Sequence, residues 1–316
     1  MPSNTEHIAF LFPGQGSQSV GMGQQLAAVY PLANQTFMDA DRLLGYSLST
    51  ISWSGPEEQL NDTINTQPAL FVHSIAVLRV IQEKYPDLHP AFVAGHSMGE
   101  LSALVSVGSL NFEEGLLLVR KRGELMKQAG EKSPGGMAAI LGLDIDTLEK
   151  ICSAASKDSE IVQIANDNCP GQIVISGASA ALERAMQSSK DAGARRAVRL
   201  AVSIAAHSPL MVHAQDSFNQ AVDSVQFTDP TIPIIGNVSA LPLLKVEDIR
   251  KDLQAQLNSR VRWTETIQLL LSKGVSTFIE IGNNSVLVGL LKRIDRKARG
   301  YSIRNPEDLE FLSTIE

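Results

Sequence analysis

The segment GHSMG, residues 95–99, places Ser97 between two glycines at the spacing G-x-S-x-G. A short apolar run, residues 91–95, precedes it, and a helical pattern begins near Gly99. In a strand–turn–helix of this kind the glycines leave room for a strained serine, and backbone N–H groups at the helix start can stabilise an oxyanion. The pattern predicts that Ser97 is a nucleophile. The alternative is a Gly/Ser loop that only closes a strand.

A serine nucleophile needs a base, and histidine is a common one. The chain has six histidines, namely His7, His73, His89, His96, His207 and His213. His96 is poorly placed because successive residues of extended backbone point to opposite faces. His7 in the leader, His73 on a predicted helix and His89 in a polar loop are set aside. His207 and His213 remain as candidates for the base. In an α/β-hydrolase the triad histidine comes late in the chain, so the early position of His213 disfavours an ordinary esterase and leaves a permuted triad open.

The second candidate is the glycine-rich loop FPGQGSQSVGMG, residues 12–23. It does not fit the dinucleotide pattern G-x-G-x-x-G, because Ser19 stands where the third glycine is needed. It also lacks the G-K-S/T ending of a phosphate-binding loop. We expect Gly14 and Gly16 to let the backbone at Gln15 approach a reacting group. A plain glycine-rich turn is the alternative.

Three consecutive cations lie in LLLVRKRGELM, residues 116–126. On a helix, Arg120, Lys121 and Arg122 point in directions about 100° apart, so one of them can face inward. A buried arginine is costly unless it is paired, and its planar fork suits a carboxylate. Spacing alone favours a solvated Arg122, and the inward orientation stays open.

Alternating strands and helices must hold these side chains. The strands predicted in the first and last parts of the chain cover residues 8–12, 91–95, 232–238 and 277–282. The helices predicted there cover residues 24–44, 66–85, 99 onward, 112–130, 208–224, 246–257 and 264–273. This alternation favours an α/β fold with a mainly parallel sheet.

The middle of the chain has a different pattern. Its predicted strands cover residues 135–143, 161–166, 171–177 and 194–203, and its predicted helices cover residues 144–156 and 179–193. The order β-α-β-β-α-β is the ferredoxin-like arrangement. We therefore expect a large α/β domain, residues 1–131 and 204–316, with an inserted ferredoxin-like subdomain at residues 132–203.

Composition narrows the class of protein. The chain has 316 residues, 44% of them hydrophobic, and a net charge of −7, which gives no global attraction to nucleic acid or to an anionic membrane. The two cysteines, Cys152 and Cys169, exclude a disulfide framework and argue against a cysteine-built metal site. Residues 1–12 do not fit a signal peptide, and no 18-residue window is both apolar and uncharged. We expect a cytoplasmic protein without a membrane span or a metal.

Seven motifs together resemble the malonyl-CoA:acyl carrier protein transacylase family and the acyltransferase domains of polyketide synthases. They are FPGQGSQ (12–18), TQPAL (66–70), GHSMGE (95–100), KRGELM (121–126), NDNCPGQIVISG (166–177), SIAAHSPLM (203–211) and IEIG with NNSVLVGLLKR (279–293). The resemblance covers nearly the whole chain and implies an α/β-hydrolase-like core. It implies an acyltransferase that moves malonyl from malonyl-CoA to the phosphopantetheine thiol of acyl carrier protein through a malonyl-serine, with no further cofactor.

The resemblance also implies roles for individual residues in the chemistry. Ser97 is expected to be the nucleophile and His207 its base. The backbone carbonyl of Gln256, instead of an acid, is expected to orient the histidine. The backbone N–H groups of Gln15 and Met98 are expected to form the oxyanion hole.

Substrate contacts follow from the same resemblance. Arg122 is expected to bind the free carboxylate of malonate, which reverses the expectation from spacing. Gln67 is expected to support the substrate. His96, the neighbour of Ser97 in the sequence, is expected to have at most a supporting role in binding substrate. Asn166 and Asn168 lie where the family lines the pantetheine tunnel.

The implied partners are a coenzyme A thioester and acyl carrier protein, with no nucleic acid and no membrane. Arg195 and Arg196 occupy the positions of a basic patch that meets the acidic carrier protein. A monomer is expected.

Two segments depart from the family pattern. In IAAH, residues 204–207, the small Ala206 excludes a branched acyl group less firmly than a large side chain would. In IGNNS, residues 281–285, the usual Gly-Pro-Gly type of turn is replaced, which could alter the loop near the site. The alternatives are a broader acyl choice such as methylmalonyl, a serine acyl-hydrolase that edits a polyketide pathway, and a non-catalytic docking subunit. An intact Ser97 and His207 disfavour the last.

Overall fold

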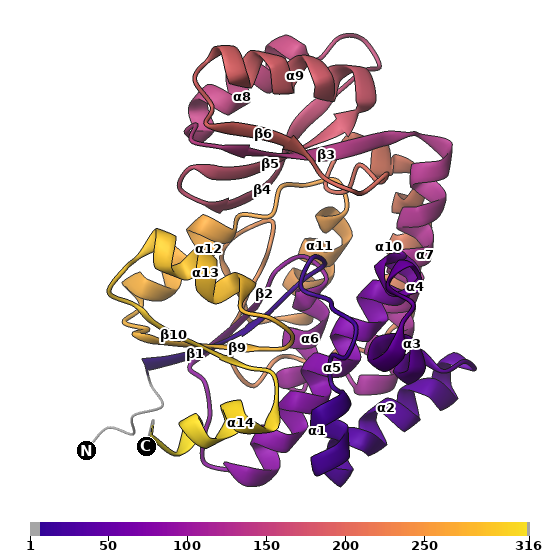
Figure 1. Ribbon diagram of the computed structural model, residues 1–316, viewed down its shortest axis with the longest axis vertical. Helices are drawn as coiled ribbons and strands as arrows, with labels where there is room; N and C mark the ends of the chain where they lie inside the picture. Colours follow the sequence, from indigo (N-terminus) through magenta and orange to yellow (C-terminus); the bar gives the residue numbers. More distant parts are fainter. Residues whose placement is uncertain (1–6, 315–316) are drawn as a thin grey trace.

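A six-stranded sheet lies at the centre of the computed structural model, which describes residues 7–314 (Figure 1). Its strands, in spatial order, are β10 (Arg299–Ile303), β9 (Thr277–Ile281), β1 (Ile8–Phe12), β2 (Phe92–Gly95), β7 (Ile234–Ile235) and β8 (Pro242–Leu243). Neighbouring strands are parallel except for β7 with β8. All five residues of β1 are buried, as in a strand that is covered on both faces. The predicted α/β fold with a mainly parallel sheet is confirmed.

Two hydrophobic clusters flank this large sheet, because alternate residues of β1 point to opposite faces. Phe10 belongs to the cluster that takes in residues of α1 (Gln24–Val29), α2 (Pro31–Leu44), α3 (Leu48–Ser54), α4 (Glu57–Asn61), α5 (Thr63–Lys84), α6 (Gly99–Ser106), α7 (Phe112–Lys132), α10 (Val212–Ser224), α11 (Val246–Gln256) and α14 (Pro306–Leu309). Leu11 belongs to the cluster formed with α12 (Trp263–Ser272) and α13 (Val286–Ile294). In Figure 1, α12 and α13 lie above the sheet, whereas α1, α2, α5 and α14 lie below it.

Helix α5 runs through the core. The Asp62 side chain caps it by accepting a hydrogen bond from Ile64 N at 3.3 Å, so the helix begins three residues before the predicted start. The helix is long and apolar enough to cross a membrane by length and composition alone. However, 83% of its most apolar 18-residue window is buried inside the protein, which is typical of a core helix.

A second, four-stranded sheet is formed by the middle of the chain. Its elements in chain order are β3 (Gly135–Leu141), α8 (Ile145–Ala155), β4 (Val162–Cys169), β5 (Gln172–Ala178), α9 (Ser179–Asp191) and β6 (Arg196–Arg199). The spatial order is β4-β5-β3-β6, and every neighbouring pair is antiparallel. The structure therefore has the predicted β-α-β-β-α-β order, and we call this the small sheet. The division into two domains at residues 132 and 203 remains a prediction.

Several predicted boundaries were wrong. The helix predicted at 24–44 is two helices, because Tyr30 is extended and Pro31, which has no N–H, starts the second one. The strand predicted at 194–203 is limited to β6, and the strand predicted at 232–238 is limited to β7. Helices α3, α4, α13 and α14 and strands β8 and β10 were not predicted. The first half of the segment used to argue against a signal peptide, residues 1–6, lies outside the described residues.

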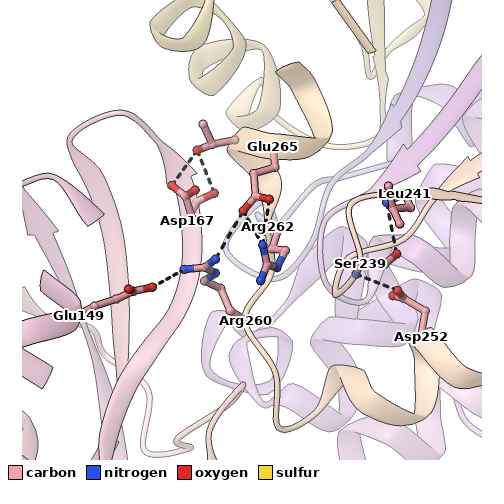
Figure 2. Close-up of polar contacts among 9 residues, drawn as sticks. Glu149, Asp167, Ser239, Leu241, Asp252, Arg260, Arg262 and Glu265 are labelled. Carbon is pink, nitrogen blue, oxygen red and sulfur yellow. Dashed lines mark hydrogen bonds and ion pairs between the residues drawn. The ribbon is translucent and has the colours of Figure 1, made fainter. Parts of the chain in front are cut away.

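A segment before α12 joins the small sheet to the large one (Figure 2). Val261 pairs with β4 through two backbone hydrogen bonds, from Asp167 N at 3.0 Å and to Ala165 O at 2.8 Å. Arg260 contacts Glu149 of α8 at 2.9 Å and Glu265 of α12 at 3.5 Å. The backbone pairing and the Arg260 contacts both attach the small sheet at this point. It fixes β4 beside the strand–helix turn that contains Ser97.

Candidate active site

Ser97 occupies the sharp turn between β2 and α6. Its φ of 53° lies in the left-handed region, which is strained for a residue with a side chain. Both flanking glycines are required by close packing: a Cβ on Gly95 would lie 2.0 Å from Gly99 C, and one on Gly99 would lie 2.2 Å from Phe12 O. The Ser97 N–H donates to Asn237 Oδ1 at 2.8 Å. The local sequence therefore produces the strained serine turn that the pattern predicted, with Ser97 half-buried.

His207 lies next to this serine. Ser97 Oγ is 2.9 Å from His207 Nε2, and His207 Nδ1 is 2.9 Å from the backbone carbonyl oxygen of Gln256. A carbonyl can only accept, so Nδ1 carries the proton and the Nε2 lone pair faces the serine hydroxyl. Burial, with a further contribution from the Arg122 charge, lowers the pKa of His207 to about 3. The neutral ring can therefore take the serine proton.

Arg122 is also inside the site, although spacing alone favoured a solvated side chain. It is 2% exposed on α7, and its guanidinium donates to Gln67 Oε1 at 2.8 Å, Gln256 Oε1 at 2.8 Å and Ser97 Oγ at 3.0 Å. Burial lowers its pKa to about 10, so it remains charged near neutral pH. None of the ion pairs within residues 7–314 includes Arg122, and its Nε has no hydrogen-bond partner there. A buried cation without a counter-ion is a ready site for a carboxylate.

A cavity of about 890 Å³ opens over these three side chains. The large-sheet region contributes the glycine loop with Gln15, and the small sheet contributes Met137, Asn166 and Asn168. Gln15 is exposed in this loop, and its Oε1 accepts a hydrogen bond from Thr63 Oγ1 at 3.0 Å. The volume suits a drug-sized ligand. Among the residues that the structure describes, no three His, Cys, Asp or Glu side chains gather to hold a metal ion.

Comparison with known proteins agrees with this geometry. The family model of the acyl transferase domain matches residues 9–304. The chain belongs to this acyl transferase family.

Relatives and solved structures of the family cover nearly the whole chain. The malonyl CoA-acyl carrier protein transacylase of Bacillus subtilis is 45% identical, over 96% of this chain and 95% of its own length. The enzyme of the same name from Escherichia coli is 43% identical, over 95% of this chain and 96% of its own length. A Vibrio cholerae acyl carrier protein S-malonyltransferase superposes with a TM-score of 0.93 at 42% identity, over 97% and 99%. A malonyl-transacylase solved with a type II PKS acyl-carrier protein superposes with a TM-score of 0.94 at 41% identity, over 96% of this chain and 98% of that chain.

The other residues expected to bind substrate in this acyl transferase line the same cavity or support it. His96 Nε2 contacts Asn168 Oδ1 at 2.8 Å, and the His96 ring packs edge-on against Trp263 at 5.4 Å, so it does not face the serine hydroxyl as a base would. Asn166 is buried in the cavity wall. Gln67 is fully buried and contacts Arg122.

Met98 and the two expected carrier-protein residues lie in different surroundings. Met98 is buried at the N-cap of α6, directly after Ser97. Arg195 and Arg196 are exposed at the start of β6 and outside the residues that line the cavity. The structure does not bring them to Ser97.

The unusual IGNNS turn holds the glycine loop of the acyl transferase site. Asn283 Nδ2 donates to Ser17 O at 2.7 Å and to Ser19 Oγ at 2.8 Å, while Asn284 Nδ2 donates to Ser17 O at 2.8 Å. Two amide side chains thus hold one carbonyl of the loop that carries Gln15. These contacts link the replaced turn to the loop near the site.

Three polar residues near the serine were missed from the sequence. They are Glu100, Asn237 and Asp252, all of them buried. The signal that could have found Glu100 is its place three residues after Ser97, in the first turn of α6, within the quoted motif GHSMGE. Asn237 follows an apolar run, and Asp252 lies in a helix that reads as ordinary and amphipathic, so neither gave a signal of its own.

Proposed function

We propose that this protein transfers a malonyl group from malonyl-CoA to the phosphopantetheine thiol of acyl carrier protein, through an ester on Ser97. The observation that carries the proposal is the buried Arg122, which lies 3.0 Å from the Ser97 hydroxyl and lacks a carboxylate partner within residues 7–314. The names of the relatives support the same reaction. A simple monoacid would leave this guanidinium unpaired.

In the first half-reaction, His207 takes the Ser97 proton while the serine oxygen attacks the thioester carbon. The resulting oxyanion is bound by the backbone N–H groups of Gln15 and Met98, each worth roughly 3 kcal/mol by comparison with other oxyanion holes. The C–S bond then breaks, and the protonated His207 returns its proton to the departing coenzyme A sulfur. The product is malonyl-serine.

The second half-reaction reverses the roles of the two groups. The pantetheine thiol gives its proton to His207, and its sulfur attacks the ester carbon. The C–O bond breaks, and His207 reprotonates Ser97. Asn166 and Asn168 line the approach of the pantetheine, and Arg195 and Arg196 form the carrier-protein contact. The protein acts as a cytoplasmic monomer.

Arg122 does more than bind the acyl carboxylate. Burial is the main cause of the lowered pKa of His207 in the free enzyme, and the positive charge of Arg122 lowers it further. When malonyl pairs with Arg122, that charge is neutralised and the basicity of His207 rises. A dicarboxylic acyl group thus improves its own base, while acetyl-CoA leaves the buried guanidinium unpaired and the histidine weak.

The test is competition of malonyl-, methylmalonyl- and acetyl-CoA for Ser97, measured by the intact mass of the protein with and without holo acyl carrier protein. We expect a malonyl adduct on the wild type, its loss when carrier protein is added, and no adduct on Ser97→Ala. Release of free malonate faster than transfer would support the acyl-hydrolase instead. An equal methylmalonyl adduct would support the broader acyl choice. The small Ala206 in the cavity wall favours that alternative.

A further inference from the structure

The side chain of Gln256 connects all three groups of the proposed chemistry. Its Oε1 accepts from Arg122 Nη2 at 2.8 Å, its Nε2 donates to Ser97 O at 3.2 Å, and its backbone carbonyl accepts from His207. A side-chain amide has one donor end and one acceptor end. If it turned over, an NH₂ group would face the guanidinium and a carbonyl would face Ser97 O. Something must therefore fix its orientation.

Glu100 provides that constraint. It is fully buried in the first turn of α6, and its Oε2 accepts from Gln256 Nε2 and, at 2.7 Å, from Asn237 Nδ2. Asn237 uses its other end to accept from Ser97 N at 2.8 Å and donates to Gly95 O at 2.8 Å. One carboxyl oxygen thus sets the orientation of both amides. Through them it holds the backbone N–H and the carbonyl of Ser97.

The other oxygen of Glu100 has a different environment. Within residues 7–314 Oε1 has no hydrogen-bond donor. Its acidic neighbour is Asp252 of α11, whose carboxylate already accepts from Val238 N and Ser239 N, each at 3.1 Å. Figure 2 shows the contact between Asp252 and Ser239. Burial and the charge of Asp252 raise the pKa of Glu100 well above its usual range. A proton on Oε1 can be donated to Asp252, which would satisfy both groups.

The protonation of Glu100 matters for Arg122, the charged group that faces it from α7. An ionised Glu100 would already offset part of the guanidinium charge. A neutral Glu100 leaves the full charge for the carboxylate of the acyl group while still holding Gln256 in place. The same residue can therefore orient the site without competing for its cation.

We propose that Glu100 is a positioning residue that acts in its protonated form, fixing the amides of Gln256 and Asn237 so that Ser97, His207 and Arg122 are held for a carboxylated acyl group. This inference rests on the proposed function. Glu100 touches neither the substrate nor the reacting atoms, so its effect must pass through the two amides.

The decisive variant is Glu100→Gln, which mimics the protonated acid: its carbonyl can accept from both amides and its NH₂ can donate to Asp252. We expect its rate of malonyl loading on Ser97, followed by intact mass, to stay within about threefold of wild type with an unchanged pH profile. Glu100→Ala should load malonyl roughly 100-fold more slowly, because the reacting groups are displaced, and should prefer malonyl over acetyl less. Glu113→Gln and Glu113→Ala, at an exposed position of α7, are the matched controls.

Folding is checked by the melting temperature of each variant. A tenfold or larger loss in Glu100→Gln, or an altered pH profile, would overturn the inference, because an ionised carboxylate would then be needed. If Glu100→Ala does not fold, Gln256→Ala replaces it, because this variant removes an amide through which Glu100 acts and keeps the backbone carbonyl for His207. Gln256→Ala should load malonyl more slowly and prefer malonyl over acetyl less, and unchanged loading and preference would overturn the inference. Wild type that does not load malonyl would instead refute the proposed function.

Discussion

The two sheets contribute to the cavity in different ways. Around the large sheet, the site is built from buried ionisable or strongly polar side chains, with Glu100, Arg122, His207 and Gln256 within one hydrogen-bonded network. The small sheet faces the same cavity with neutral groups such as Asn166 and Met137. Buried charges are tolerated only where partners surround them. The contrast supports the proposal that residues around the large sheet perform the chemistry and that the small sheet shapes the access route.

Substitutions on the two sides should therefore fail in different steps. Changes in the network should slow acyl loading from coenzyme A. Changes at the exposed Arg195 and Arg196 of the small-sheet region, outside the cavity lining, should affect delivery to the carrier protein and leave loading intact.

His207→Ala should have the largest effect. Without a base for the serine proton, malonyl loading on Ser97 should fall about 1,000-fold. The rate is measured by quench-flow with intact-mass detection. His213→Ala is the matched control, since His213 was the other candidate base and is exposed. A loss below tenfold in His207→Ala, or an equal loss in His213→Ala, would contradict the assignment.

Arg122→Ala should come next, with malonyl loading reduced roughly 100-fold because a buried charge-assisted pair is lost. Acetyl loading should fall much less, so the ratio of the two rates reports the carboxylate contact directly. Lys121→Ala, the exposed neighbour on α7, controls for the change in net charge. An unchanged malonyl-to-acetyl ratio would rule out carboxylate binding by Arg122.

Replacing Arg195 and Arg196 together by glutamate should reduce transfer to carrier protein by about three- to tenfold, mainly through slower association. Loading from malonyl-CoA should not change. Lys150→Glu on α8, also exposed on the small-sheet region, is the control. Loss of loading together with transfer would show that the small sheet takes part in the chemistry after all.

The smallest effect on activity is expected for His73, which is buried in α5. This residue should affect the stability of the fold instead. Burial lowers its pKa to about 4, below the unfolded value near 6.5, so the unfolded chain binds a proton first as the pH falls. The free energy of unfolding should therefore decrease below pH 6.5, by roughly 2 kcal/mol at about pH 5 from this residue. His207 adds to this in the same direction.

Urea unfolding of wild type and His73→Gln at several pH values measures this slope. The free energy of unfolding of His73→Gln should depend less steeply on pH than that of wild type. The exposed control His89→Gln should keep the wild-type slope. Residues 132–203 contain no histidine, so hydrogen exchange at acid pH should show the large-sheet region opening first. Equal slopes for wild type and His73→Gln would contradict this account.

Much of the architecture was predictable because its signals are local. The apolar runs at 8–12 and 91–95 and the glycines around Ser97 follow from strand burial and turn sterics. The β-α-β-β-α-β order of the small sheet follows from alternating short patterns. The short strand β7 and the break at Pro31 were misjudged, because the number of paired residues and the exact turn depend on distant neighbours.

The sequence by itself determined the nucleophile turn, the α/β class and, through its motifs, the family. Only the tertiary structure decided that Arg122 points inward, because helical periodicity gives angles around an axis and not which side is buried. It also decided that Glu100, Asn237 and Gln256 form one network, since their contacts join residues more than 130 positions apart. The energetics of buried charge depend on such contacts, and no local pattern encodes them.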